Sequence, residues 1–316
     1  MLSRVADSLY WIGRRLERAE HAARLVEVNL MLMLDQDPAS ADHRWARLHD
    51  ALGGEPLPDA DGYACAHALA FDRKRDDSIY GCVAAAREQA RQVREHITAE
   101  MYEQLNTLYF TVRRTDFDEV WDRQPQAFFR SMRHGAHLFH GITESTLNHG
   151  QGYYFLQAGR HLERIGATAR LLQTYLCETE PSLRGDTGVQ IACAGLLKSC
   201  DAFEAYQTTY PEQLTVERVA GFLTLNPDFP RSIRFAVNRL FDAVQTLARL
   251  TGSRRADSVV RPVGRIHARL QYGQTEDLHP DRLHAFLQRL LNDAEAVHAA
   301  NHRAYISYPI EQEVYA

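Results

Sequence analysis

Residues 2–34 read LSRVADSLYWIGRRLERAEHAARLVEVNLMLML, and this stretch decides the fold. Apolar residues recur in steps of three and four from Leu2 to Met33, which is the spacing of one face of an α-helix. The helix should end no later than Pro38, because proline does not continue a helix. One long amphipathic helix is therefore the first predicted element.

The same pattern returns later in the chain. A shift of 146 positions places residues 13–18, GRRLER, on residues 159–164, GRHLER. A second match, at an offset of 154, relates residues 69–83 to residues 223–237. Two matches in the same order predict an internal duplication. We therefore expect an all-α helical bundle of two sequence-related, pseudo-symmetric halves, residues 1–150 and 151–316, that form one integrated domain.

Most of the remaining chain also has helical spacing, and signals for strands are nearly absent. Ser78 and Ser232 are candidate N-caps, because a serine oxygen accepts a free amide hydrogen of the first turn. Stretches rich in glycine or charge predict loops at 53–59 and 252–264, although 261–271 also suits a short helix. The other predicted helices are 44–52, 79–108, 125–148, 155–176, 189–210, 215–225, 233–250 and 280–305.

Composition and charge exclude several classes of protein. The 316 residues are 45% apolar, which is ample for a hydrophobic core. With 36 basic and 41 acidic residues, the net charge of -5 disfavours a nucleic-acid-binding surface. No apolar run approaches the roughly 20 residues that span a bilayer, and the start lacks the pattern of a signal peptide. We expect a cytoplasmic protein that contacts neither membrane nor nucleic acid.

The repeated Glu-Arg pairs are the first candidate site. Glu17 and Glu163 are the candidate acid/base residues, and they lie beside or opposite the apolar stripe, so packing of that stripe does not require them. One interpretation is structural, with ion pairs on each helix surface or buried between the helices. The other is a cleft in which arginines bind carboxylate or phosphate groups. The arginines considered for it are Arg14, Arg18, Arg24, Arg160, Arg164 and Arg170.

Histidines and further arginines give weaker candidates. His134, His137 and His140 recur every three residues, and His137, His140 and Glu144 could face one way as metal ligands. No His-Glu-x-x-His motif supports a metal, so solvated or hydrogen-bonded histidines are the favoured interpretation and no metal is predicted. Arg231, near a predicted helix start where the dipole disfavours cations, is a modest candidate for anion binding, as is Arg234.

Several motifs of nucleotide and hydrolase chemistry are absent. The sequence has no G-x-x-x-x-G-K-[ST] phosphate loop, no G-x-G-x-x-G after a strand and no G-x-S-x-G elbow. We therefore expect no cofactor and no nucleotide chemistry carried out by this chain alone.

Residues 1–20, MLSRVADSLYWIGRRLERAE, closely resemble the start of the bacterial alpha-E family. Residues 90–95, 103–106, 159–164 and 222–232 resemble further signatures of that family. The resemblance implies an α-helical protein named for its Glu-Arg motif and usually encoded beside a circularly permuted ATP-grasp protein and a transglutaminase-like peptidase. ATP-grasp enzymes join carboxylates to amines through acyl phosphates. The residues that carry the motif here are Arg14, Glu17, Arg18, Arg160, Glu163 and Arg164.

Three functions follow as expectations. The first is a helical accessory or substrate-binding protein of an ATP-grasp peptide or amide ligase, with that ligase, a peptide substrate and possibly the transglutaminase-like protein as partners. The second is a stand-alone enzyme that acts on peptide or amide groups with Glu17 or Glu163 as acid/base. The third is a bundle that binds small anions. The sequence leaves the oligomeric state open.

Overall fold

The structure is a computed structural model, and it describes residues 1, 3–34, 41–53, 61–177, 186–211, 214–253 and 255–306. These residues form fourteen α-helices and no strand, so the all-α prediction is confirmed. None of these helices is both long enough and apolar enough to cross a membrane.

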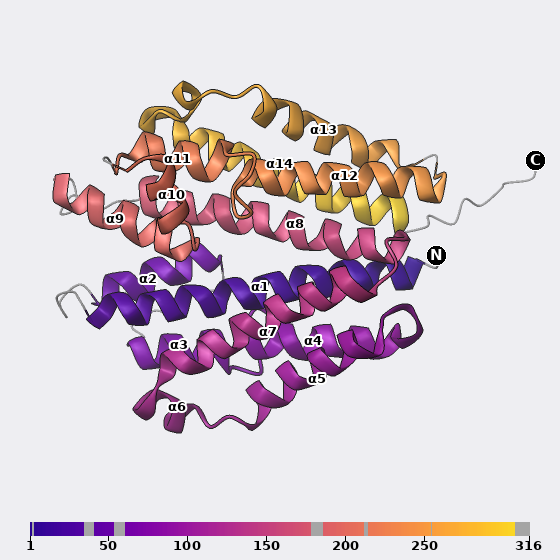
Figure 1. Cartoon of the computed structure of the whole chain (residues 1–316), viewed down its shortest axis with the longest axis horizontal. Coiled ribbons are helices and arrows are strands. Elements are labelled where there is room, and N and C mark those ends of the chain that lie inside the picture. The colour runs from indigo at the N-terminus through magenta and orange to yellow at the C-terminus, as the bar shows by residue number, and fades with distance from the viewer. Residues whose placement is uncertain are drawn as a thin grey trace, which may run out of the picture.

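Two helices run side by side through the middle of the molecule in the same direction, α1 (Ser3–Leu34) and α8 (Gln151–Leu172) (Figure 1). Most of the other helices of the first half lie on one side of this central pair, and most helices of the second half lie on the other (Figure 1). The first half adds α2 (Ala41–Leu52), α3 (Gly62–Ala70), α4 (Ile79–Gln92), α5 (Ala99–Arg114), α6 (Phe117–Arg123) and α7 (Pro125–Thr146). The second half adds α9 (Asp186–Ser199), α10 (Phe203–Thr209), α11 (Val216–Leu225), α12 (Ile233–Thr251), α13 (Asp257–Gln271) and α14 (Pro280–Tyr305).

The central helices touch through two glycines. A Cβ atom added to Gly13 would overlap the backbone carbonyl oxygen of Leu156, and one added to Gly159 would overlap the carbonyl oxygen of Tyr10. Only glycine allows two helix backbones to approach this closely. The contact is reciprocal, because residues 10 and 13 correspond to residues 156 and 159 under the shift of 146.

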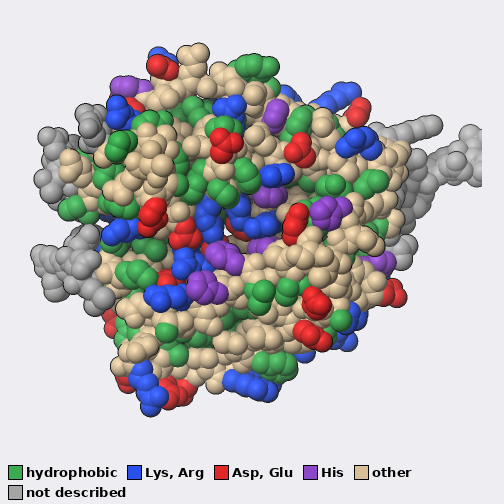
Figure 2. Space-filling model, in the orientation of Figure 1, with side chains coloured by type: hydrophobic (Ala, Val, Ile, Leu, Met, Phe, Trp, Pro, Cys, Tyr) green, Lys and Arg blue, Asp and Glu red, His purple; other side chains and the backbone are tan. Residues whose placement is uncertain are grey.

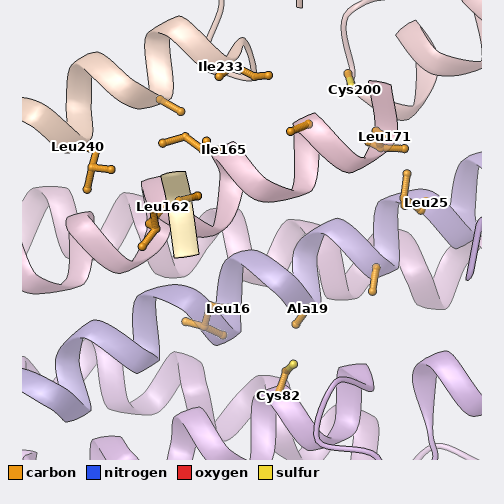
Figure 3. Close-up of a cluster of buried hydrophobic side chains, with 14 of the residues drawn as sticks. Leu16, Ala19, Leu25, Cys82, Leu162, Ile165, Leu171, Cys200, Ile233 and Leu240 are labelled. Atoms are coloured by element: carbon orange, nitrogen blue, oxygen red, sulfur yellow. The ribbon is translucent and has the colours of Figure 1, made fainter. Parts of the chain in front are cut away.

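The hydrophobic core is continuous through both halves. Leu16 and Ala19 of α1 lie between α8 and Cys82 of α4, whereas Ile165 of α8 lies between α1 and α12 (Figure 3). Burying each large aliphatic side chain of this kind stabilises the fold by about 1.5 to 3 kcal/mol. The core fixes the central pair in place, and with it the charged residues on the two helices.

Several predicted elements are confirmed, and others differ in their details. Ser78 and Ser232 cap α4 and α12 as predicted, each accepting a hydrogen bond from the backbone amide three residues on. The helix predicted at 79–108 divides into α4 and α5, with a short 3-10 turn at Arg94–His96 between them. The helix predicted at 189–210 breaks at Asp201, whose φ of 49° is left-handed. Helices α3 and α6 were not predicted.

The loop predicted at 252–264 is wrong for its second part, because α13 begins at Asp257 and carries Pro262 inside it. Val259, Val263 and Ile266 are buried at helical spacing, and their packing outweighs the hydrogen bond that the proline removes. Residues 54–59 of the other predicted loop lie outside the described residues.

Candidate functional site

Glu17 of α1 is bound by two arginines of α8. Its carboxylate accepts hydrogen bonds from Arg164 Nε at 2.5 Å and Arg164 Nη2 at 2.8 Å, and from Arg160 Nε at 3.4 Å. Glu17 is only 2% exposed. Arg164 also donates to the carbonyl oxygen of Pro230, at 3.0 Å, and so ties the turn before α12 to this pair. The first buried ion pair therefore links both central helices and the start of α12.

Glu163 of α8 is bound in the same way by two arginines of α1. Its carboxylate accepts hydrogen bonds from Arg14 Nε and Arg18 Nε, both at 2.7 Å, and Glu163 is also 2% exposed. Each glutamate thus binds the two arginines that flank its counterpart on the other helix. We call this arrangement of Glu17, Glu163 and their four arginines the reciprocal clasp.

The arginines keep both glutamates ionised. Burial alone would raise the pKa of Glu163, but Arg14 and Arg18 outweigh burial and lower it to about 2. Burial is likewise outweighed at Glu17, where Arg164 and Arg160 hold the pKa well below its usual range. Each glutamate is therefore a charged, fixed acceptor rather than a proton-exchanging group near neutral pH.

A second group of charges continues along α1, with Glu20, Arg24 and Glu27 buried and Arg130 and Asp201 exposed. Glu20 accepts hydrogen bonds from Arg231 Nη2 at 2.7 Å and Arg231 Nη1 at 3.1 Å. Arg24, one turn further, pairs with the same carboxylate. The group includes two other carboxylates: Glu27 pairs with Arg130 and Arg133, and Asp201 pairs with Arg24, Arg133 and Arg231.

A cleft of about 490 Å³ opens between α7, α8 and α12, next to this buried charge. In the space-filling view, arginine and histidine side chains gather in the hollow between the two halves, with acidic groups close by (Figure 2). Arg160 and Arg164 of the clasp line the cleft from α8, whereas Glu17 lies behind them. The other ionisable lining residues are His137, His140, Glu144, Tyr153, Tyr154, His161, Arg239 and Asp242.

Two of the lining histidines are buried and incompletely bonded. His140 and His161 are each 6% exposed, and no hydrogen-bond partner meets either ring nitrogen of His140 or Nδ1 of His161 in the described part of the chain. Burial lowers the pKa of His140 well below its usual value, and Arg160 lowers it further. The two rings are thus neutral near pH 7, and their unbonded nitrogens are buried in the wall of the cleft.

The family described as a predicted α-helical domain with a conserved ER motif, Alpha-E, matches residues 1–306. The chain belongs to the Alpha-E family. An uncharacterised protein of Mycobacterium bovis is 24% identical over 310 residues, a match that covers 91% of this chain and 35% of that protein. An uncharacterised protein of Mycobacterium tuberculosis is 23% identical with the same coverage. The chain spans about a third of the length of these relatives, and no solved structure matches it significantly.

The Alpha-E structure separates the candidate residues into distinct places. Among the glutamates and arginines of the Glu-Arg pairs, only Arg160 and Arg164 line the cleft, and the candidate ligands His137, His140 and Glu144 line it too. Arg14, Arg18 and Glu163 form the other arm of the clasp, and Arg24 belongs to the Glu20 group. Arg170 lies beside Gly53 and Gly166, and burial lowers its pKa.

We expected packing to leave the charged face of α1 unconstrained, and it does not. Glu17 and Arg24 are buried because α1 is covered by α8, α4 and α7 on different sides rather than along one apolar stripe. Of the two structural alternatives, ion pairs on one helix surface do not form between Arg14 and Glu17, whereas ion pairs buried between the helices are observed. Both residues pair across the helix interface instead.

Several site residues were not selected from the sequence. Glu20, Glu27, His161 and Asp201 are among them, whereas Arg231 was noted as a candidate. A signal for two of them was present, because Glu17, Glu20, Arg24 and Glu27 follow one another in steps of three, four and three, which is a charged stripe along one helical face.

The histidine series does not assemble as a metal site among the described residues, in which no group of three suitable ligands is found. His134 is exposed, and His137 lies at 3.3 Å from Glu20. His140 faces Glu17 at 3.8 Å. These contacts place the last two histidines beside the buried carboxylates of α1.

Proposed function

We propose that this Alpha-E chain is a substrate-binding accessory protein of an ATP-grasp peptide or amide ligase, and that the cleft holds a negatively charged group of the substrate. One observation carries the proposal: the ion-pair network that begins at the wall of the cleft and continues along α1 has an excess of arginine. Six arginines share four carboxylates, an excess of two positive charges. The carboxylates are Glu17, Glu20, Glu27 and Asp201, and the arginines are Arg24, Arg130, Arg133, Arg160, Arg164 and Arg231.

The arm of the clasp at the cleft, formed by Glu17, Arg160 and Arg164, suits a binding role because it holds the two arginines before any ligand arrives. Arg164 is fixed by Glu17 and by the Pro230 carbonyl, so little side-chain freedom is lost when it meets an anion. Arginine presents a planar fork of donors that matches carboxylate and phosphate oxygens. Arginine side chains that are already charged and fixed in position favour binding of an anionic substrate group.

The partner in the proposal is supported by the family resemblance and by the relatives. In the mycobacterial proteins the matching region makes up 35% of a longer chain. A helical unit that is joined to further sequence in its relatives is a reasonable candidate to act beside another protein.

Co-purification tests this role. The chain is co-expressed with an ATP-grasp protein from the same genome, and we expect a stable complex and faster amide formation than with the ligase alone. Arg160→Gln should reduce the stimulation, whereas Arg14→Gln is the matched control because it removes the corresponding arm of the clasp outside the cleft. The proposal is wrong if no complex forms and the ligase rate is unchanged by adding the chain.

Acid/base chemistry by Glu17 or Glu163 has less support. Each carboxylate is buried behind two arginines, does not line the cleft and has a lowered pKa, so it is a weak base at neutral pH.

Anion binding without a ligase is the second candidate, and it is favoured by the same arginines that line the cleft. A thermal-shift screen of small anions tests it directly, because a ligand that binds only the folded state stabilises it.

We also infer that the two halves, residues 1–150 and 151–316, descend from one duplicated helical unit. The reciprocal clasp and the reciprocal glycine contacts support this inference, since both follow the shift of 146. The serine caps add support at the offset of 154: Ser78 donates to the carbonyl of Asp72, and Ser232 donates to the carbonyl of Asn226.

A further inference from the structure

The cleft has charges of both signs. We propose that it binds a zwitterion, an amino acid or short peptide that carries a free carboxylate and a free ammonium group. This deepens the proposed function and rests on it, because the class of substrate is inferred for the same cleft.

Arg160 and His140 form the end that would receive the carboxylate. Arg160 bonds Glu17 through Nε alone, so its two Nη groups have no hydrogen bond to any other described residue. His140, on the facing helix α7, is buried with both ring nitrogens unpartnered. A carboxylate accepts hydrogen bonds from an arginine fork and from a neutral imidazole N–H. It would satisfy buried groups that this part of the chain leaves unsatisfied.

Glu144 and Asp242 form the end that would receive the ammonium group. Both line the cleft, Glu144 from α7 and Asp242 from α12, and both are exposed. Neither forms an ion pair within the described part of the chain, and the hydrogen bond of Glu144 comes from the hydroxyl of Tyr153, at 2.6 Å. Tyr154 and Phe235 add aromatic surface beside them, and such surface attracts cations.

The balance of charge favours a zwitterion over a simple anion. Arg160, Arg164 and Arg239 line the cleft together with two carboxylates, and a third carboxylate, that of Glu17, lies directly behind the arginines. A phosphate dianion at Arg160 would meet repulsion from all three. A zwitterion instead places each of its charges near groups of opposite sign. The volume of about 490 Å³ lies within the range of small-molecule sites.

NMR titration of the full chain with four probes tests the proposal. The probes are diglycine, N-acetyl-diglycine, diglycine amide and inorganic phosphate. We expect diglycine to bind at least about tenfold more tightly than the other three, because only diglycine carries both charges. The proposal is overturned if N-acetyl-diglycine or phosphate binds as tightly as diglycine, or if diglycine does not bind.

Variants locate each end of the ligand. The double variant Glu144→Gln, Asp242→Asn changes two exposed residues, so the chain should still fold. This variant should bind diglycine no more tightly than N-acetyl-diglycine. Arg160→Gln should weaken both of these ligands, whereas Arg14→Gln should leave both unchanged. An unaltered preference in the Glu144/Asp242 double variant would reject the site. If diglycine binds but the chain forms no complex with the ligase, the proposed function is wrong and the proposed binding site is supported.

Discussion

The glutamates of the reciprocal clasp are buried charges, and their effect on the stability of the fold depends on the arginines that pair with them. Glu163 would be costly to bury alone, but Arg14 and Arg18 compensate its charge. Its pKa of about 2 in the fold lies below its ordinary value of 4.5. The resulting stabilisation is present above pH 4.5 and is lost as the pH falls towards 2.

Neutralising a clasp glutamate should destabilise the fold. Glu163→Gln keeps the shape of the side chain but leaves Arg14 and Arg18 without a counter-charge, so we expect a loss of about 3 kcal/mol in the free energy of unfolding. Glu17→Gln should cost a similar amount. Urea denaturation measures both, with the exposed Glu144→Gln as control, expected within about 0.5 kcal/mol of the parent chain. Equal stability of all three variants would contradict a structural role for the clasp.

The buried histidines predict a pH dependence in a different range. Burial, followed by neighbouring arginines, lowers the pKa of His21, His140 and His161 well below 6.5. Below pH 6.5 the unfolded chain binds protons that the fold does not, so stability falls as the pH falls. Each histidine contributes about 1.4 kcal/mol per pH unit, or about 4 for the three together.

Urea midpoints between pH 8 and pH 5 check this pH dependence. Acid and base groups surround His140: Glu17 and Glu20 on α1, and Arg160 and Arg164 on α8. His140→Gln should reduce the slope by about a quarter, because His298, whose pKa burial lowers to about 4, is a fourth ring that stays neutral in the fold. A slope that is the same in the variant and the parent would mean that His140 is not buried in its neutral form.

At the scale of elements, the crossing of α1 and α8 depends on two glycines. Helical spacing predicted both helices, and it predicted α14 and α7 nearly to their ends. The same spacing could not reveal that Gly13 lies under the Leu156 carbonyl, because that contact joins residues far apart in the sequence. The break at Asp201 was likewise hidden, since its left-handed backbone is set by surrounding contacts rather than by residue type.

Alanine at the crossing should force the central helices apart. Gly13→Ala or Gly159→Ala places a methyl group on a backbone oxygen, which cannot move aside as a side chain can, and we expect a loss of about 3 kcal/mol. Gly141→Ala on α7 is the matched control, because no atom lies within 4 Å of its added Cβ. It should gain about 0.5 to 1 kcal/mol from helix propensity. Thermal unfolding of the three variants distinguishes these results, and a tolerated Gly13→Ala would show that the helices are less closely packed.

At the scale of the whole molecule, each half neutralises charges buried in the other. Glu17 relies on arginines from residues 151–316, and Glu163 relies on arginines from residues 1–150. Separation of the halves would leave both glutamates without partners. Stability should therefore be shared across the chain rather than held by each half.

This sharing predicts a single unfolding transition. All three tryptophans, Trp11, Trp45 and Trp121, lie in residues 1–150, so fluorescence reports on the first half and, through the contact of Trp11 with His298, on its interface with α14. Far-UV circular dichroism reports on helices of the whole chain. We expect the two denaturation curves to coincide, because neither half keeps its clasp glutamate paired with arginine without the other. Separate midpoints would show that the halves unfold independently and would contradict the single-domain prediction.

The candidate site was predictable only in part. The Glu-Arg motif stood out because both halves repeat it, which pointed to Arg160 and Arg164. The cleft is also lined by His140 from α7 and Asp242 from α12. Those helices come together through tertiary packing, which helical spacing along the chain does not encode.

The coverage of α1 has a consequence for the dynamics of the molecule. Since α8, α4 and α7 pack around this helix, all of residues 19–30 are buried. Their amide hydrogens should exchange with deuterium only when the whole chain unfolds. Hydrogen exchange in α1 therefore reports on unfolding of the whole chain. The faster exchange of the outer helices, which open locally, can be compared with it.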